Sequence, residues 1–248
     1  MTNLVIDIGN THTKVAVFID KKLDQINYYE QFTLQHLAMW LRDYAVSHSI
    51  ISAVNAQHVE SFEQLLKTAT QYTRFSVNAT NTIDNRYKSP ETLGLDRLAA
   101  IIGAQALYPN TDCLVIDAGT CITYDAVDSK GAYRGGSISP GLHMRLKALN
   151  AFTARLPLVD LDVNFAEWEG NDTRTSILSG VMQGAILELQ GFIQMYHDRH
   201  PQLKVILCGG DAFFFDTRLK NTIFAHLLNI ESNLVLIGLN EVIYQQNA

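Results

Sequence analysis

Residues 4–9 read Leu-Val-Ile-Asp-Ile-Gly, and residues 114–119 read Leu-Val-Ile-Asp-Ala-Gly. The match extends along residues 4–17 and 114–127, which also share the pairs Thr13/Thr123, Ala16/Ala126 and Val17/Val127. Because two unrelated segments rarely agree at so many positions, the match indicates a duplicated chain. This repeat decides the fold prediction, since each half must then contain the same arrangement of strands.

Each copy has the pattern of a buried strand that ends in a phosphate-binding turn. Gly exposes backbone N–H groups to an anion, and short polar side chains add donors. Two such turns predict one nucleotide between them. A plain hairpin at Gly9–Asn10 is the alternative for the first copy. It accounts neither for the second copy nor for Asp7, whose carboxylate is costly at the end of a buried strand unless it meets a cation or several donors.

Length and composition favour two globular domains. The chain has 248 residues, 47% of them hydrophobic and 18% charged. The spacing of the two copies predicts domains of similar size, with residues 1–111 in the first and 112–248 in the second. Aliphatic strand-like runs alternate with amphipathic segments, which is typical of the α/β class.

Strands and helices are predicted along the whole chain. Strands are expected at 4–7, 13–18, 50–54, 75–77, 113–117, 122–127 and 205–208, and helices at 59–69, 96–107, 142–151 and 176–197. Residues 78–92 and the glycine-rich run 135–141 are expected to be loops, and residues 234–245 a short strand with a terminal helix.

Charge and leader signals exclude several classes. The net charge of −6 and the lack of a basic run argue against a general nucleic-acid binder. No export signal precedes the first strand, and no apolar run looks long enough to span a bilayer. Cys113, Cys121 and Cys208 lack metal-ligand spacing, so we expect buried free thiols in a cytoplasmic protein.

The residues of the turns suit a polyphosphate. Asn10, Thr11 and Thr13 can donate to phosphate oxygens, and Lys14 can approach the β- or γ-phosphate. Thr120 can donate from the opposite side. An ionised Asp117 cannot donate, so it is expected to hold a cation, with capping of the turn as the alternative.

Two further segments complete the predicted site. The turn Gly209-Gly210-Asp211 would allow a flat base to approach the backbone. Asp96, in Gly94-Leu95-Asp96-Arg97, is either a helix N-cap or the carboxylate that orients a hydroxyl acceptor for phosphoryl transfer. Arg97 opposes the helix dipole in the first turn, which suggests an anionic ligand.

These motifs resemble the type III pantothenate kinases, members of the acetate and sugar kinase/Hsp70/actin superfamily. The matching residues span nearly the whole chain in the family's order. They are Asp7-Ile8-Gly9-Asn10-Thr11 with Lys14, Tyr87 with Pro90 ahead of Gly94-Leu95-Asp96-Arg97, Asp117-Ala118-Gly119-Thr120, Gly135-Gly136 through Pro140-Gly141, Leu156-Pro157, and Gly209-Gly210-Asp211. The resemblance implies two similar ribonuclease H-like α/β domains, the duplicated actin-like ATPase fold, with a nucleotide cleft between them.

The resemblance also implies an activity and residue roles. The reaction is ATP-dependent phosphorylation of pantothenate to 4'-phosphopantothenate, the first step of coenzyme A synthesis, by a cytoplasmic homodimer that uses Mg²⁺ and a monovalent cation. Asp96 is the implied base, and Asp117 binds potassium or ammonium. ATP is held by Asp7, Ile8, Gly9, Asn10, Thr11, His12, Thr13, Lys14 and Thr120. Pantothenate is held by Tyr87, Gly94, Leu95, Asp96 and Arg97, and by Thr173 of the partner subunit.

Three alternatives stay open. The family's threonine before the long helix is either Thr173, preferred because it lies seven residues before Gly180, or Thr175. The same scaffold could serve a non-catalytic ATP-binding regulator, since relatives have been described as accessory transcription factors. It could also serve another small-molecule kinase of the superfamily, because fold does not settle function.

Overall fold

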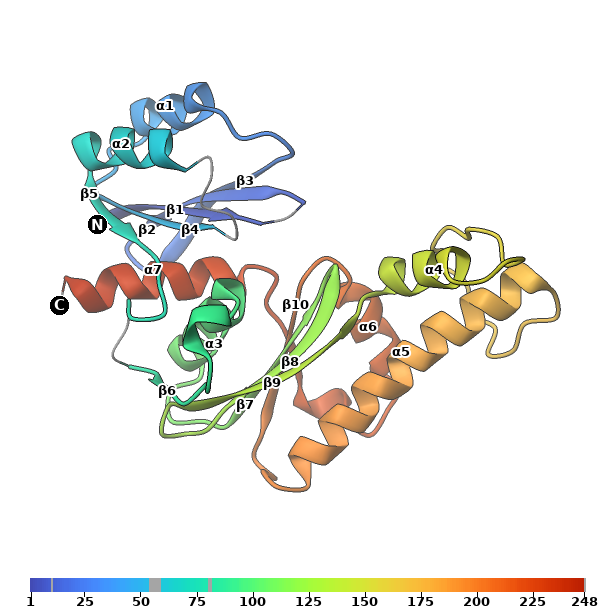
Figure 1. The fold of residues 1–248 in the computed structure, drawn as a ribbon. Helices are drawn as coiled ribbons and strands as arrows, with labels where there is room; N and C mark the ends of the chain where they lie inside the picture. The colour runs from blue at the N-terminus through green and yellow to red at the C-terminus, as the bar shows by residue number, and fades with distance from the viewer. Residues whose placement is uncertain (10, 54–58, 80–81, 248) are drawn as a thin grey trace. The chain divides into compact units, whose positions relative to one another are not determined.

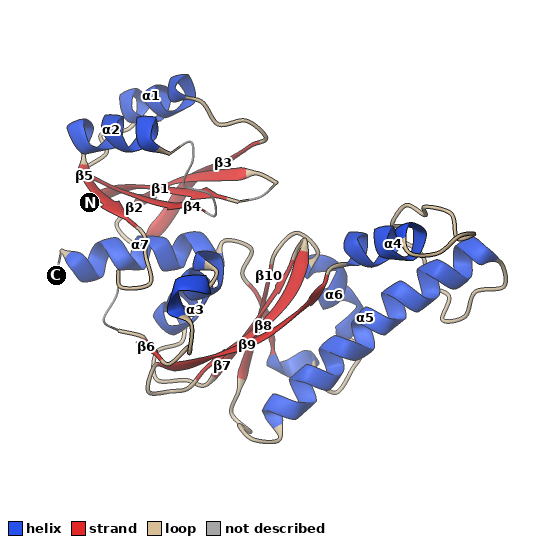
Figure 2. Cartoon of the chain, viewed as in Figure 1, coloured by secondary structure: helices blue, strands red, loops and turns tan. Residues whose placement is uncertain are grey.

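The computed structural model describes residues 1–9, 11–53, 59–79 and 82–247 (Figure 1). The chain forms two compact units. The first comprises residues 1–110, 131–134 and 233–248, and the second comprises residues 111–130 and 135–232. Both units combine helices with strands (Figure 2), so the α/β class is confirmed.

The first unit contains a five-stranded sheet of order β3-β2-β1-β4-β5. Its central strand β1 is antiparallel to β2 and parallel to β4. Residues 3–7 of β1 are all buried, which is why the strand reads as a continuous apolar run. The strands are β1 (Thr2–Ile8), β2 (Thr13–Ile19), β3 (Lys22–Tyr29), β4 (His48–Ala53) and β5 (Gln71–Arg74).

The second sheet repeats this order. It runs β11-β10-β7-β8-β9-β6, so that β9-β8-β7-β10-β11 matches β3-β2-β1-β4-β5 strand for strand. Strand β7 is antiparallel to β8 and parallel to β10, as β1 is to β2 and β4. The strands are β6 (Asp84–Asn85), β7 (Cys113–Ala118), β8 (Cys121–Val127), β9 (Ala132–Pro140), β10 (Lys204–Cys208) and β11 (Leu228–Ile230). The duplication predicted from the repeated sequence is confirmed.

Each sheet is followed by a helix that packs in the first unit. The helix α3 (Leu95–Leu107) follows β5 and α7 (Leu234–Gln246) follows β11, and the two lie side by side (Figure 1). A side chain at Gly238 would collide with the backbone oxygen of Ala99, and one at Gly103 with that of Leu234. Glycine at both positions therefore allows the two helices to approach closely.

The remaining helices flank the strands within each unit. They are α1 (Leu34–Asp43) and α2 (Glu60–Ala69) in the first unit, and α4 (Leu142–Ala151), α5 (Thr173–His197) and α6 (Ala212–Leu219) in the second, with short 3₁₀ turns at Pro90–Thr92 and Ala225–Leu227. Helix α5 is long and apolar enough to cross a membrane by length and composition, whereas the sequence predicted no segment of that kind. Half of its apolar window is buried, and residues such as Leu178 and Leu189 lie in the core of the second unit.

Several predicted elements differ from the structure. Residues 135–140 belong to strand β9 and do not form a loop. Gly136 fits inside this strand because a side chain there would collide with the carbonyl oxygen of Tyr124. The strand expected at 75–77 lies instead at Gln71–Arg74, and residues 234–246 are entirely helical. Strand β3 and helix α1 were not predicted, and Val54 of the predicted strand lies outside the described residues.

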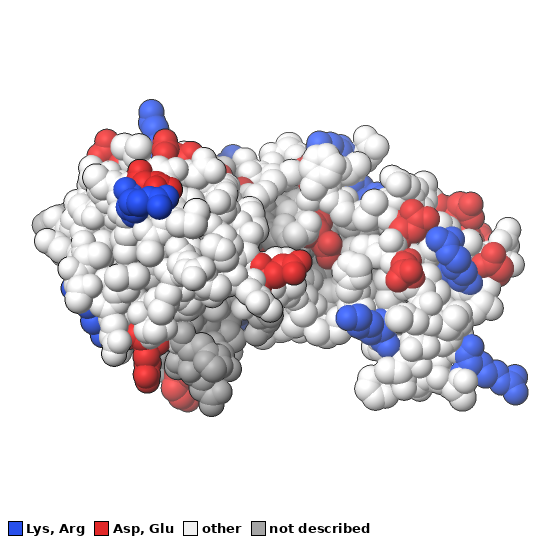
Figure 3. Space-filling view, turned by 90° about the horizontal axis from the view of Figure 1, so that it is seen from above, with Lys and Arg blue, Asp and Glu red and all other residues white. Residues whose placement is uncertain are grey.

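The charged side chains and the cysteines are distributed as follows. On the face shown in Figure 3, Lys and Arg side chains are dispersed among Asp and Glu and form no single patch. Cys113 and Cys208 are buried and Cys121 is half-buried, all as free thiols. Burial, with the charge of Asp112, raises the pKa of Cys113 to about 12, so its thiol stays protonated.

Candidate functional site

The first predicted phosphate turn connects β1 to β2. Ile8 pairs with Thr13, and the Gly9 N–H donates to the His12 carbonyl oxygen at 3.2 Å, so residues 9–12 form a four-residue connection. Asn10 lies outside the described residues. The φ of Gly9 is not positive, whereas a two-residue type I′ turn requires a positive φ at its first central residue. The plain Gly9–Asn10 hairpin is therefore excluded.

Asp7 and Lys14 lie directly opposite each other at the base of this turn. Paired residues of an antiparallel ladder project from the same face. Asp7 is 9% exposed, and Lys14 is half-buried. The Lys14 ammonium makes no ion pair or hydrogen bond with any residue that the structure describes. It is thus available to an anion held at the turn.

The side chains that leave the turn differ in exposure. Thr11 and His12 are exposed, Thr13 is buried, and Ile8 is half-buried. Exposed hydroxyl and imidazole groups can meet a ligand directly, whereas the buried side chain of Thr13 is less accessible. The turn therefore combines an acidic strand end, a free ammonium and exposed polar groups.

The second predicted phosphate turn is shorter. Strand β7 ends at Ala118 and β8 begins at Cys121, and the Gly119 N–H donates to the Cys121 carbonyl oxygen at 2.9 Å. Thr120 is exposed, and its carbonyl oxygen accepts the N–H of Gly141 at 3.1 Å. The start of helix α4 is thus joined to the turn by a backbone hydrogen bond.

The predicted adenosine turn contacts the predicted cation ligand within the second unit. Gly209 has φ +88°, and a side chain there would collide with the carboxylate of Asp117 and the carbonyl oxygen of Ala118. The Asp211 N–H donates to that same carbonyl at 2.9 Å. Burial raises the pKa of Asp211, an effect opposed by the charge of His143. Glycine is needed at position 209 for both the backbone conformation and the close approach.

A cavity of about 710 Å³ lies beside this turn. Gly210 and Asp211 form part of its wall. A Cβ on Gly210 would meet no atom within 4 Å, so the wall is open at this residue. The other lining residues come from the segment before α5 and from α6 and its end, and are Val163, Asn164, Ala166, Phe213, Phe214, Thr217, Arg218 and Asn221.

Asp96 lies in the first turn of α3 but is not its N-cap, which is Gly94. The alternative prediction that Asp96 is the helix N-cap is therefore wrong. Its Oδ1 accepts the backbone N–H of Arg97 at 2.8 Å, and a Cβ on Gly94 would lie 2.5 Å from that oxygen. Asp96 is exposed, and its second oxygen makes no hydrogen bond with a described residue. One oxygen therefore fixes the carboxylate and the other is free to act.

Arg97 and Tyr87 come together in the first unit, as the predicted substrate pocket requires. Arg97 is only 7% exposed, and its Cζ lies 5.6 Å from the centroid of the Tyr87 ring. Tyr87 in turn stacks on Tyr133, with centroids 6.3 Å apart and planes at 6°. A buried guanidinium on an aromatic face is held at one place and orientation. Leu95 is half-buried at the start of the same helix.

The two candidate threonines lie at the start of α5 and differ in their contacts. Asp172 is the N-cap, and the Thr175 hydroxyl donates to its Oδ1 at 2.8 Å and accepts its N–H at 3.1 Å. Thr175 is therefore committed to the capping box. The Thr173 hydroxyl makes no hydrogen bond with a described residue.

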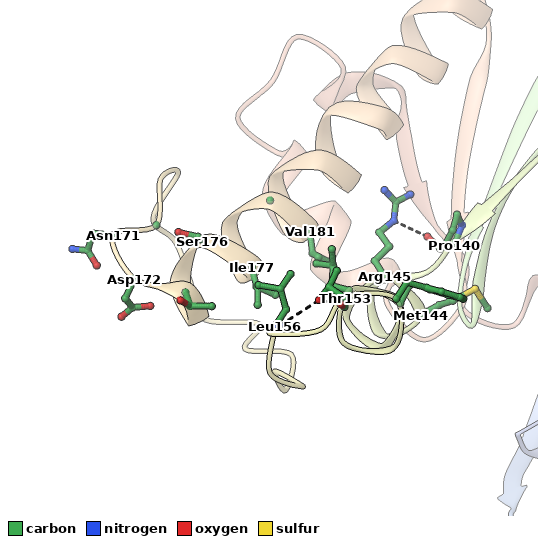
Figure 4. Close-up of a pocket in the computed structure, with 16 residues that line it drawn as sticks. Pro140, Met144, Arg145, Thr153, Leu156, Asn171, Asp172, Ser176, Ile177 and Val181 are labelled. Atoms are coloured by element: carbon green, nitrogen blue, oxygen red, sulfur yellow. Dashed lines mark hydrogen bonds between the residues drawn. The ribbon is translucent and has the colours of Figure 1, made fainter.

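Thr173 lines a cavity of about 1280 Å³ within the second unit. Figure 4 shows Ile177 and Val181 of α5 close to Leu156 and Thr153, with Arg145 and Pro140 at one end. Most of the lining is apolar, and Phe152, one of the lining residues, is 89% exposed. An exposed aromatic residue beside an apolar cavity is typical of a binding surface.

Comparison with known proteins decides the family. The sequence model of the type III pantothenate kinases matches residues 3–195. A type III pantothenate kinase from Bacteroides fragilis is 43% identical over 245 residues, covering 99% of this chain and 98% of the relative. The chain belongs to the type III pantothenate kinase family. The family resemblance and the enzyme class predicted from the sequence are thereby confirmed.

Solved structures confirm the predicted fold for this pantothenate kinase family member. A chain from Campylobacter jejuni, named as a Baf family transcriptional activator, aligns with TM-score 0.62 at 21% identity and 98% coverage of both chains. A glucokinase from an Antarctic psychrotroph aligns with TM-score 0.50 at 12% identity, covering 100% of this chain and 99% of that chain. At these identities the likeness concerns the fold alone, which this chain shares with a solved glucokinase.

The structure also answers whether a metal cluster is present and names site residues that were not predicted from the sequence. In the described part of the chain, no three His, Cys, Asp or Glu side chains gather as a metal site. The lining residues Asn164 and Asn221 and the carboxylate of Glu188 were not predicted. No local pattern marks them, because their neighbours come from distant parts of the sequence.

Proposed function

We propose that this protein transfers the γ-phosphoryl group of ATP to the primary hydroxyl of pantothenate, forming 4'-phosphopantothenate for coenzyme A synthesis in the cytoplasm. The family supports the substrates. The observation that carries the mechanism is the geometry of Asp96. One carboxylate oxygen is held by the Arg97 N–H at 2.8 Å and the other is free in an exposed position.

Asp96 acts mainly by orienting the acceptor hydroxyl. A carboxylate is a weak base toward an alcohol, so the proton moves late, when the hydroxyl has begun to bond to phosphorus. Most of the rate then comes from positioning and from neutralising the charge on the phosphates. Arg97 binds the pantothenate carboxylate, and Tyr87 keeps its guanidinium in place. Gly94 and Leu95 complete this side of the pocket.

The two Asp-x-Gly turns bind the triphosphate. The first offers backbone N–H groups and the side chains of residues 7–14, and the free ammonium of Lys14 supports this role. Thr120 donates from the second turn. The adenine base of ATP then lies against Gly209-Gly210 at the cavity of about 710 Å³. We further propose that the evolutionary halves are residues 1–111 and 112–248, each with one phosphate turn.

The second turn also fits a monovalent cation. The Asp117 carboxylate and the Ala118 carbonyl oxygen both lie 2.4 Å from the position that a Cβ on Gly209 would take, so two oxygen ligands face the same point. Such oxygen ligands suit hard cations, and potassium and ammonium are the proposed occupants. When bound, this cation and Mg²⁺ neutralise charge on the phosphates. Asp117, together with Ala118, would hold the monovalent ion.

Thr173 of the partner subunit completes the pantothenate pocket in a homodimer. The choice of Thr173 over Thr175 is supported by the capping bonds that occupy Thr175. The apolar cavity that Thr173 lines and the exposed Phe152 support a subunit interface on this face.

A pantothenate-dependent ADP release assay, run with and without potassium, tests the proposal. A kinase releases ADP only when pantothenate is present, and release rises with potassium. ADP release that never depends on pantothenate would contradict it. A non-catalytic regulator would bind ATP without such turnover, and screening sugars and hydroxy acids would reveal another small-molecule kinase.

A further inference from the structure

We propose that Glu188 is a positioning residue that holds the second phosphate turn in its ATP-binding conformation. The inference rests on the proposed function, because it assigns that turn to ATP. Glu188 lies in the middle of α5, and among the described residues its side chain hydrogen-bonds to Tyr124, Ser139 and Arg145, none of which belongs to the turn. It acts through the chain segment that supports the turn.

Glu188 joins four secondary-structure elements. Its Oε1 accepts the hydroxyls of Tyr124 on β8 at 2.8 Å and of Ser139 on β9 at 2.5 Å. Its Oε2 accepts Nη2 of Arg145 on α4 at 2.6 Å. The Nε of Arg145 also donates to the carbonyl oxygen of Pro140 at 2.8 Å (Figure 4). The end of β9 is thus held from two sides.

This clamped segment leads directly into the phosphate turn. Gly141 follows Pro140, and its N–H donates to the Thr120 carbonyl oxygen at 3.1 Å. A Cβ on Gly141 would collide with the carbonyl oxygen of Gly119 and lie 2.6 Å from that of Thr120. The two backbones are in direct contact, so a shift of residues 139–141 must displace the turn.

Charge and burial make the network rigid. The side chains of Glu188 and Arg145 are 26% and 20% exposed. Burial raises the pKa of Glu188, but hydrogen bonds from Arg145, Ser139 and Tyr124 outweigh it and leave the pKa below its ordinary value. Tyr124 is fully buried and stacks on Phe192, with centroids 3.9 Å apart. A charged carboxylate with three donors holds its neighbours more firmly than a neutral acceptor would.

Glu188 is better suited to a test than Arg145. Arg145 lines the cavity that contains Thr173, whereas Glu188 does not. Substituting Glu188 therefore changes the support of the turn with the least direct change to the proposed pantothenate pocket. Glu188→Ala removes all acceptors, and Glu188→Gln keeps one oxygen for Tyr124 and Ser139.

Asp112 offers a matched control. Its side chain is 25% exposed and accepts the Ser129 N–H at 2.8 Å, with His200 Nδ1 at 3.1 Å. It precedes β7, at the opposite end of that strand from the phosphate turn. Asp112→Ala thus removes comparable contacts from the same unit without affecting the support of Gly141.

The experiment measures ATP·Mg²⁺ binding by calorimetry, KM for both substrates and Tm. Glu188→Ala should weaken ATP binding and raise the KM for ATP about tenfold, which corresponds to about 1.4 kcal/mol, and change the KM for pantothenate much less. Glu188→Gln should restore only part of the affinity, because it keeps an acceptor for Tyr124 and Ser139 but loses the one for Arg145. Asp112→Ala should lower Tm but leave ATP binding unchanged.

Three outcomes would overturn the inference. They are wild-type ATP affinity in Glu188→Ala, equal weakening in Asp112→Ala, and an absence of ATP binding in the wild-type protein. If the wild-type protein binds ATP but does not phosphorylate pantothenate, the proposed function fails. The calorimetric comparison of the three variants then still decides the role of Glu188.

Discussion

The guanidinium of Arg97 lies over the aromatic ring of Tyr87, with Cζ 5.6 Å from the ring centroid. The two residues are ten positions apart in the sequence, and the loop between them brings Tyr87 back onto the first turn of α3. The contact orients a cation that is only 7% exposed.

Tyr87→Leu should raise the KM for pantothenate several-fold, because Arg97 loses the face that orients its guanidinium. A cation–π contact of about 1 kcal/mol corresponds to roughly a fivefold change. Tyr87→Phe keeps the aromatic face and serves as the control. Steady-state kinetics with varied pantothenate measures both, and equal KM values for the two variants would contradict the role of the ring.

Gly210→Ala should weaken ATP binding several-fold without lowering Tm. The added methyl meets no protein atom within 4 Å, and Gly210 lines the cavity proposed for the adenine base of ATP. Gly184→Ala on α5, which also has no atom within 4 Å of its Cβ, is the control. Calorimetric titration with ATP measures the difference. If Gly210→Ala binds ATP with unchanged affinity, the adenine base does not lie at this cavity.

Thr173→Ala and Thr175→Ala should have opposite profiles. Thr173→Ala should raise the KM for pantothenate at unchanged Tm, since its hydroxyl has no partner among the described residues. Thr175→Ala should lower Tm, because it breaks the capping box at the start of α5. Steady-state kinetics and thermal melting of both variants measure these effects. A raised KM for pantothenate in Thr175→Ala but not in Thr173→Ala would contradict the choice of Thr173.

Much of the fold could be predicted because the apolar runs are local signals. Strands β1 and β7 are buried along nearly their whole length, and helix α4 was predicted with its observed bounds. Strand β3 escaped prediction because most of its residues are exposed or half-buried and polar, as expected at a sheet edge. The run 135–140 looked like a loop because the close approach of Gly136 to Tyr124 depends on the folded sheet.

In the candidate site too, local signals could be predicted from the sequence, whereas contacts between distant segments could not. Turn residues such as Asp7, Lys14 and Asp117 could be predicted because glycine and short polar side chains mark phosphate turns locally. The contact between Glu188 and Arg145 joins residues 43 positions apart in the sequence. Such pairing becomes apparent only when α4 and α5 are packed together.

Stability should depend on pH through Glu63. Burial raises its pKa, but hydrogen bonds from Tyr72 and Arg74 and the charges of Arg74 and Lys67 hold the pKa below its ordinary value of 4.5. The ionised form is therefore favoured by folding. Its stabilisation is complete above pH 4.5 and is lost as pH falls through the lower pKa of the folded state.

Glu63→Gln should therefore lower the free energy of unfolding by about 1–2 kcal/mol at pH 7. The difference from the wild-type protein should shrink below pH 4.5. Glu60→Gln, an exposed position in the first turn of the same helix α2, should behave like the wild type at every pH. Denaturant unfolding at pH 7 and pH 3.5 measures the two differences, and a pH-independent difference would contradict the assigned cause.

The most direct measurement is pantothenate-dependent ADP release by the wild-type protein and by Asp96→Asn, with ATP binding followed in parallel. The asparagine still offers an oxygen to the Arg97 N–H, so the turn stays folded while the free acidic oxygen is lost. We predict potassium-stimulated turnover in the wild type, a loss of about 10²-fold or more in the variant, and nearly equal ATP affinity. Wild-type turnover by Asp96→Asn would contradict the central claim.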